Sequence, residues 1–176
     1  MAHLREISQL GSDVLRCVAK EVEDITSRET QTLIDDLIFT CKANQGLGIA
    51  APQVGHSQAI MIIASEPNER YPHAPLMPPT AFINPQLLSH SNEVEKEWEG
   101  CLSLPGIRAL VPRYTWIDVS YRDSNGAFHT ERFEGFLARI FQHEYDHLIG
   151  HVFIDRIESS MDVVMEKEYQ RLRSLG

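Results

Sequence analysis

The chain has 176 residues, 43% of them hydrophobic, which suits one domain with a sizeable core. Its formal net charge of −9 argues against a general nucleic-acid-binding surface, and an apolar run such as residues 59–64 is far too short to span a membrane. Three cysteines at unrelated spacings suggest no disulfide framework, and the N-terminus lacks the apolar run of a signal peptide. We therefore expect a single domain over residues 1–176 in the cytoplasm, with no membrane and no specific nucleic-acid partner.

The first half of the chain predicts a helix, a strand and a loop. Thr26-Ser27-Arg28-Glu29 fits a capping box, and the apolar residues after it keep helical spacing until just before Gly46. Residues 59–63 have the continuous apolar character of a buried strand. Residues 65–80 hold five of the nine prolines, so this stretch is expected to be a surface loop.

The second half predicts more strands and then two helices. Residues 94–98 are strand-like, and Asn125-Gly126 is a strong hairpin-turn signal between strands expected at 116–121 and 128–133.

One helix is expected between Gly135 and Gly150, where the second glycine suits a C-terminal cap. A last helix is expected to open at Ser159-Ser160-Met161-Asp162 and to run toward Leu175. The order of elements predicts an α+β fold.

The most informative motif is His143-Glu144-Tyr145-Asp146-His147, an H-E-x-x-H pattern. On a helix, positions i and i+4 share a face, so His143 and His147 can direct two imidazoles at one metal ion. Glu144 lies beside them, where it can act as a general base on a metal-bound water. Apolar residues on most sides indicate a buried helix, and burying these polar groups is costly unless a metal pairs with them. The motif predicts a metal-dependent hydrolase; the alternative is a helix that carries these residues by chance.

A catalytic site of this kind normally has a third protein ligand. Downstream candidates are poorly supported. The spacing of one zinc-peptidase class places Phe153 at the ligand position, and another class uses a glutamate near Glu166 and Glu168, which lie in a charged segment that looks solvated.

Upstream, Cys101 lies in a glycine- and proline-flanked stretch, and as a thiolate it would be a strong ligand for Zn(II) or Fe(II). Cys17 and Cys41 lie in helical patterns and suit buried apolar positions. Spacing alone does not choose among the three cysteines.

Three segments, in order, resemble the peptide deformylase family. They are Gly46-Leu47-Gly48-Ile49-Ala50-Ala51-Pro52-Gln53, which matches G-apolar-G-apolar-A-A-x-Q; Glu99-Gly100-Cys101-Leu102-Ser103, which matches E-G-C-L-S; and Gln142-His143-Glu144-Tyr145-Asp146-His147, which matches Q-H-E-x-D-H. The similarity runs from about Leu15 to Asp155, and the departures are peripheral. It implies one catalytic domain with antiparallel sheets packed around a central H-E-x-x-H helix, an N-terminal helix and a C-terminal helix.

The resemblance implies that Cys101, His143 and His147 bind one divalent metal, with water in the fourth position and Glu144 as the base. It also implies that the metal, the side-chain amide of Gln53 and the backbone N–H of Leu102 stabilise an oxyanion. Fe(II) is the expected metal. Zn(II), Ni(II) or Co(II) can substitute, because one thiolate and two imidazoles suit all four.

The reaction implied by the resemblance is removal of the N-formyl group from the initiator methionine of nascent polypeptides, with release of formate. Gly48 would let backbone approach the substrate, while Leu47 and Gly100 would pair with an extended peptide as in strand addition. The resemblance places Ile140 in the wall of the methionine pocket. Arg108 is expected either at the rim of that pocket or as a solvated surface charge.

Two rival interpretations stay open. A metallo-endopeptidase would need a downstream ligand and a groove open on both sides of the scissile bond. A metal-stabilised scaffold would have no use for Glu144 beside an open coordination position.

The substrate emerges from the ribosome, so a transient ribosome contact through the last helix is one expectation. Its formal charges cancel, however, because Asp162, Glu166 and Glu168 oppose Lys167, Arg171 and Arg173. We expect weak, salt-sensitive association at best and a monomeric protein.

Overall fold

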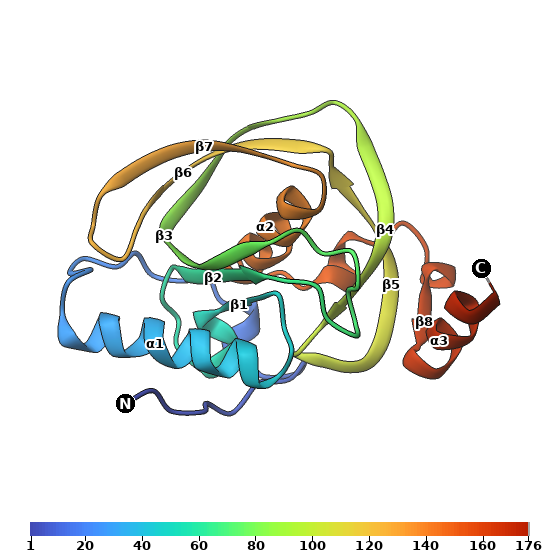
Figure 1. The fold of residues 1–176 in the computed structure, drawn as a ribbon, viewed down its shortest axis with the longest axis horizontal. Helices are drawn as coiled ribbons and strands as arrows, with labels where there is room; N and C mark the ends of the chain where they lie inside the picture. Colours follow the sequence, from blue (N-terminus) through green and yellow to red (C-terminus); the bar gives the residue numbers. More distant parts are fainter. Residues whose placement is uncertain (176) are drawn as a thin grey trace.

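Two antiparallel sheets and three α-helices make up residues 1–175, the part of the chain that the computed structural model describes (Figure 1). The predicted α+β class is confirmed. The larger sheet has the order β1-β2-β3-β6-β7, and the smaller has the order β4-β5-β8. The helices are α1 (Arg28–Ala43), α2 (Gly135–Leu148) and α3 (Glu166–Leu175). The strands are β1 (Gly48–Ala50), β2 (Ile60–Ser65), β3 (Met77–His90), β4 (Val94–Cys101), β5 (Leu104–Tyr114), β6 (Trp116–Arg122), β7 (Phe128–Glu134) and β8 (Val163–Met165).

The run of apolar residues in β2 is explained by helices on both faces of the sheet. Ile60 and Ile62 belong to a buried cluster with residues of α1, whereas Met61 and Ile63 belong to a second cluster with residues of α2. Figure 1 shows α1 and α2 on opposite sides of β1 and β2. Because successive side chains of a strand point to opposite faces, burial of both faces requires the continuous apolar run. Besides β1 and β2, α2 contacts strand β5 of the smaller sheet.

The start of α1 differs from the predicted capping box. Ser27, not Thr26, is the N-cap, and its hydroxyl accepts a hydrogen bond from the backbone N–H of Thr30. Thr26 instead donates its hydroxyl to Asp24. At the other end the helix stops before Gly46, as predicted, with Gln45 in the left-handed conformation at φ 55°.

The end of α2 is as predicted. The helix ends at Leu148, and Gly150 has a φ of 80°. The N–H of Gly150 bonds to the carbonyl of His147, and the N–H of His151 bonds to that of Asp146, which is a Schellman cap. A side chain on Gly150 would also meet the backbone carbonyl of Arg16 at 2.6 Å.

The predicted loop at 65–80 is wrong at both ends. β2 includes Ser65, and β3 begins at Met77 and includes Pro78 and Pro79. Prolines are tolerated there because β3 pairs only with β2 in this stretch, through an irregular register, and pairs with β6 only from Ile83 onward. The segment between the two strands is residues 66–76.

The last helix also begins later than predicted. Ser159 caps a short 3-10 turn, and β8 then pairs Val163 with Ala109 and Val164 with Arg108 of β5. The helix α3 begins only at Glu166, because the two β-branched valines extend the smaller sheet first. No helix among residues 1–175 is long and apolar enough to cross a membrane.

A carboxylate in α1 holds the start of the chain. Asp36 is fully buried and accepts hydrogen bonds from the His3 amide at 2.6 Å and from Nε of Arg5 at 2.7 Å. Burial opposes the charged form, but the His3 amide and the Arg5 guanidinium outweigh it and lower the pKa of Asp36.

We expect Asp36→Asn to destabilise the protein by about 1–3 kcal/mol, the scale of hydrogen bonds to a charged group. Since the folded-state pKa is lowered, the stabilisation is present at neutral pH and is lost as pH falls through the acidic range. Urea unfolding at pH 7 and pH 3 measures this: the difference between the two proteins should shrink at pH 3. An equal difference at both pH values would contradict the assignment.

Candidate metal centre

Three side chains converge at one point between β4 and α2. One donor atom from each of Cys101, His143 and His147 lies within 4.8 Å of the others. Cys101 is the last residue of β4, and the histidines occupy successive turns of α2. Nε2 of His147 is 3.4 Å from Sγ of Cys101. The structure thus brings together the three residues singled out as ligands.

The other two cysteines lie elsewhere. Cys41 is buried in α1, as expected. Cys17 is exposed, which contradicts the buried position expected for it. It follows a short 3-10 turn that ends at Arg16, so the helical pattern inferred there does not continue.

The electrostatics at Cys101 favour a thiolate. Burial opposes the charged form, but His147 and His143 outweigh it and hold the pKa of Cys101 well below its ordinary value. A thiolate and two imidazoles form a donor set that suits Zn(II) or Fe(II). The residues present therefore fit a divalent metal.

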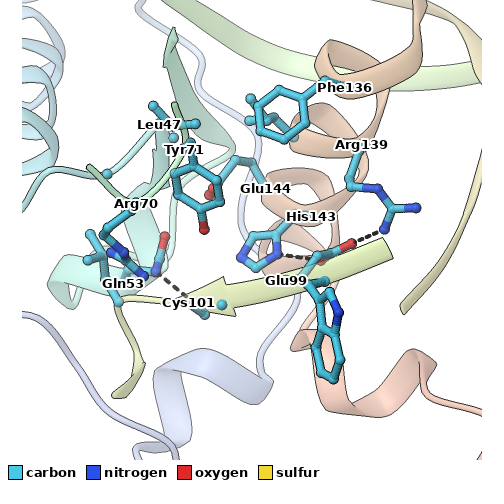
Figure 2. Close-up of a pocket in the computed structure, with 16 residues that line it drawn as sticks. Leu47, Gln53, Arg70, Tyr71, Glu99, Cys101, Phe136, Arg139, His143 and Glu144 are labelled. Carbon is cyan, nitrogen blue, oxygen red and sulfur yellow. Dashed lines mark hydrogen bonds and ion pairs between the residues drawn. The ribbon is translucent and has the colours of Figure 1, made fainter. Parts of the chain in front are cut away.

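The carboxylate of Glu99, which was not among the site residues predicted from the sequence, orients His143. Oε1 of Glu99 lies 2.8 Å from Nδ1 of His143, which leaves Nε2 of that ring for a metal. Glu99 is buried, and although burial opposes its charge, Arg113 and His143 hold its pKa far below the usual range. Figure 2 shows Glu99 between His143 and Arg139, with dashed lines to both. Its position in the E-G-C-L-S segment was the available signal.

The carboxylate of Glu144 is buried and, within the described part of the chain, incompletely hydrogen-bonded, as expected for a general base. It is 4% exposed, and within residues 1–175 its Oε2 has no hydrogen-bond partner. Burial raises the pKa of Glu144 to about 7, which is suited to accepting and returning a proton near neutral pH. A side chain on Gly48 would lie 2.7 Å from Oε1 of Glu144, so this glycine is needed to admit the carboxylate itself.

Gln53 has a fixed orientation. Its Oε1 accepts the backbone N–H of Ala50 at 2.9 Å, so its NH₂ group points the other way. That group donates to the hydroxyl of Ser103 at 3.1 Å and to Sγ of Cys101 at 3.5 Å. Ser103 is fully buried and was not predicted, although it ends the E-G-C-L-S segment. The amide donor of Gln53 therefore lies beside the predicted ligands.

A narrow cavity of about 60 Å³ opens onto these groups (Figure 2). Its lining includes the backbone and pocket candidates Leu47, Gly48, Gly100, Leu102 and Ile140. Sequence reasoning missed several further lining residues. They are Arg70, Tyr71, Trp98, Phe136 and Arg139. Arg70 and Tyr71 come from the segment between β2 and β3, whose position over the site has no local sequence signal.

Arg108 is neither at the rim nor solvated. It is 2% exposed and does not line the cavity. Its Nε pairs with Glu166 at 2.7 Å, and its Nη1 donates to the hydroxyl of Tyr71 at 3.2 Å. Arg108 thus holds Tyr71, a residue that lines the cavity, without lining the cavity itself. Glu166, expected to be solvated, is the ion-pair partner of a buried arginine.

The arrangement suits hydrolysis of a carbonyl compound. The donor set fits a Lewis-acidic metal, a carboxylate with a pKa near neutrality lies beside it, and an oriented amide donor faces the same cavity.

Comparisons with known proteins agree with this chemistry. The profile of one family, polypeptide deformylase, matches residues 4–162. The chain is 53% identical over 169 residues to "Peptide deformylase 2" of Nostoc sp., covering 96% of this chain and 94% of that protein. It is 43% identical to "Peptide deformylase 1" of Xanthomonas campestris, over 89% of this chain and 91% of the relative.

Among solved structures, it resembles a class I type b peptide deformylase from Acinetobacter baumannii, crystallised with Met-Ala-Ser bound. The TM-score is 0.86 at 40% identity, over 89% of this chain and 100% of that one.

Proposed function

The chain belongs to the polypeptide deformylase family, so it is a metal-dependent hydrolase that removes the N-formyl group from nascent polypeptides, and we propose which of its residues do this. Cys101, His143 and His147 hold one divalent metal, and Glu144 is the general base. The observation that carries the proposal is the buried Glu144 carboxylate, which lines the same cavity as Cys101 and His143 and whose Oε2 has no hydrogen-bond partner within residues 1–175.

The metal, when bound, lowers the pKa of water and polarises the formyl carbonyl. We expect Fe(II), and the Cys-His-His donor set also accepts Zn(II), Ni(II) or Co(II). Glu99 fixes the ring of His143, and the side-chain amide of Gln53 donates to Cys101 and to Ser103.

Glu144 takes a proton from the attacking water as the water oxygen bonds to the formyl carbon. The oxygen of the former carbonyl gains negative charge, and the NH₂ group of Gln53 and the backbone N–H of Leu102 donate to it. Glu144 then passes the proton to the leaving nitrogen as the C–N bond breaks. The products are formate and a peptide with a free N-terminal amine.

The methionine side chain enters the apolar part of the cavity, where Ile140 and Phe136 form the wall. Leu47 and Gly100 pair with the extended peptide backbone. Support comes from the relative from Acinetobacter baumannii, which was crystallised with a peptide that begins with methionine.

We further propose that α2 is the helix around which both sheets are organised and that residues 1–176 act as one catalytic domain. The contacts of α2 with β1, β2 and β5 support the first point, and the match over residues 4–162 supports the second. Because the substrates are new polypeptides, we place the enzyme in the cytoplasm. We also expect it to act as a monomer.

The proposal is tested with three substrates: formyl-Met peptides, acetyl-Met peptides and casein. We expect formate from the first and no cleavage of the other two. Cleavage of casein would favour the metallo-endopeptidase, and inactivity of the metal-loaded protein toward all three would favour a scaffold role.

A weak ribosome contact is a further expectation. Arg171 pairs with Glu168, and Arg173 stacks its guanidinium over the ring of Tyr169 at 5.7 Å, so these cations already have partners within the chain. We therefore expect Arg171→Glu combined with Arg173→Glu to leave turnover of short formyl-Met peptides largely intact. Sedimentation with ribosomes at near-physiological salt is the measurement; tight binding that the double substitution abolishes would contradict the expectation.

A further inference from the structure

A series of charged side chains leads from the surface to His143. Arg156 donates from Nε and Nη2 to the two oxygens of Asp146, at 3.1 and 2.8 Å. Arg113 donates to Oδ2 of Asp146 at 2.6 Å and to both oxygens of Glu99 at 2.9 Å. Oε1 of Glu99 then faces Nδ1 of His143 at 2.8 Å. These contacts connect the 3-10 turn at Phe153–Arg156 to the metal centre through β5 and β4.

Burial increases along this series. The side chain of Arg156 is 41% exposed, whereas those of Asp146, Arg113 and Glu99 are 6%, 4% and 5% exposed. Arg156 lies in a cleft with Tyr114 and Tyr145, and that cleft shares no lining residue with the cavity at the metal centre. Asp146 and Arg113 also line that cleft, but Arg156 is by far the most exposed member of the series.

Each acceptor oxygen in the series has a defined partner. Among residues 1–175, Oδ1 of Asp146 accepts a side-chain hydrogen bond only from Arg156, while Oδ2 is shared by Arg156 and Arg113. Without Arg156, Arg113 would be the remaining cation on Asp146, and Asp146 would compete with Glu99 for it. A buried carboxylate that has lost one partner makes such a rearrangement favourable.

Loss of Arg156 would affect Glu99 at Oε1, the oxygen that faces His143. Its Oε2 is held by both Arg113 and Arg139, whereas within residues 1–175 its Oε1 accepts from no arginine other than Arg113, through Nη2, and faces His143. A shift of Arg113 toward Asp146 would thus loosen the oxygen that fixes the His143 ring. The hydrogen bond to the non-ligating nitrogen sets the tautomer and orientation of a metal-binding histidine.

We propose that Arg156 is a positioning residue for deformylation, which keeps Asp146, Arg113 and Glu99 in the arrangement that orients His143. The inference rests on the proposed role of His143 as a metal ligand. It assigns a function in the site to a side chain that lines a separate cleft and does not line the cavity at the metal centre.

The test compares Arg156→Gln, Arg156→Lys and the matched control Arg16→Gln in the full chain. Arg16 pairs with Asp155, the residue next to Arg156, so its loss perturbs the same turn without touching the series. Three properties are measured: the ¹⁵N shifts of the His143 ring in the metal-free protein, the rate at which a chelator removes Zn(II), and unfolding in urea.

We expect Arg156→Gln to shift the His143 ring signals and to release Zn(II) about tenfold faster, the low end of the effects seen for residues behind metal ligands. Arg156→Lys should fall between this variant and the wild type, because it keeps the charge but loses the two-pronged contact. Arg16→Gln should match the wild type. In a Glu99→Gln background, Arg156→Gln should add nothing to Zn(II) release, because the last contact of the series is already changed.

Unchanged His143 signals and Zn(II) release in Arg156→Gln, with or without lost stability, would overturn the inference, because water in the cleft would then replace Arg156. If His143→Ala binds Zn(II) as tightly as the wild type, the proposed metal site fails as well. The two failures are therefore distinguishable.

Discussion

Glu144→Gln should keep a full complement of metal and lose about 10²–10⁴-fold in turnover, the usual contribution of a general base. Glutamine has nearly the same shape, so it fits the space left by Gly48, but it cannot accept a proton. Turnover of a formyl-Met peptide and metal content should be measured on the same sample. Glu93→Gln, a change at an exposed glutamate, is the matched control and should behave as the wild type.

The surroundings of Glu144 indicate that Glu144→Gln should change the chemistry without unfolding the protein. Because Oε2 has no partner within residues 1–175, the substitution breaks no hydrogen bond at that oxygen, and the protein should remain folded. Near-wild-type turnover with full metal occupancy would remove Glu144 from the mechanism.

Cys101→Ala should lose most of its metal, and its activity should fall with it. Two imidazoles would remain, and the thiolate is the ligand that distinguishes this donor set. Elemental analysis after dialysis measures the loss directly. Cys17→Ala, at an exposed cysteine, and Cys41→Ala, at a buried one, are the controls.

The two controls separate the possible causes of a loss. Cys41→Ala shows what removal of a buried thiol costs the fold alone, and both control variants should keep one metal per chain. Full metal content in Cys101→Ala, or loss of metal in Cys17→Ala, would contradict the ligand assignment.

The sequence predicted the elements whose local patterns are strong. The apolar run at 59–63, the Asn125-Gly126 turn and the glycine cap at Gly150 all appear as expected. The errors occur where pairing with a distant strand decides. Val163 and Val164 join β5 and delay α3, and Pro78 and Pro79 are accommodated where β3 pairs with β2 alone.

The predicted ligands and base were identifiable because motif spacing and residue chemistry coincide at Cys101, His143, Glu144 and His147. Their supporting residues were not. Glu99 and Ser103 lie at the two ends of the E-G-C-L-S segment, but only the folded chain shows which atoms they contact.

Arg108 illustrates the same limit for a single charge. The sequence offered a rim position or a solvated one, whereas the structure buries it between Tyr71 and Glu166. Its partners, Tyr71 and Glu166, are distant in the sequence, so no local sequence pattern predicts these contacts.

The most direct test of the account is a metal titration of the protein, prepared without metal and under anaerobic conditions. Formate release from a formyl-Met peptide should be absent without metal, should rise in proportion to added Fe(II), and should stop rising at one metal per chain. Cys101→Ala should show no such saturation at one equivalent. Formate release without metal, or activity that saturates at one equivalent in Cys101→Ala as in the wild type, would contradict a metal site formed by Cys101, His143 and His147.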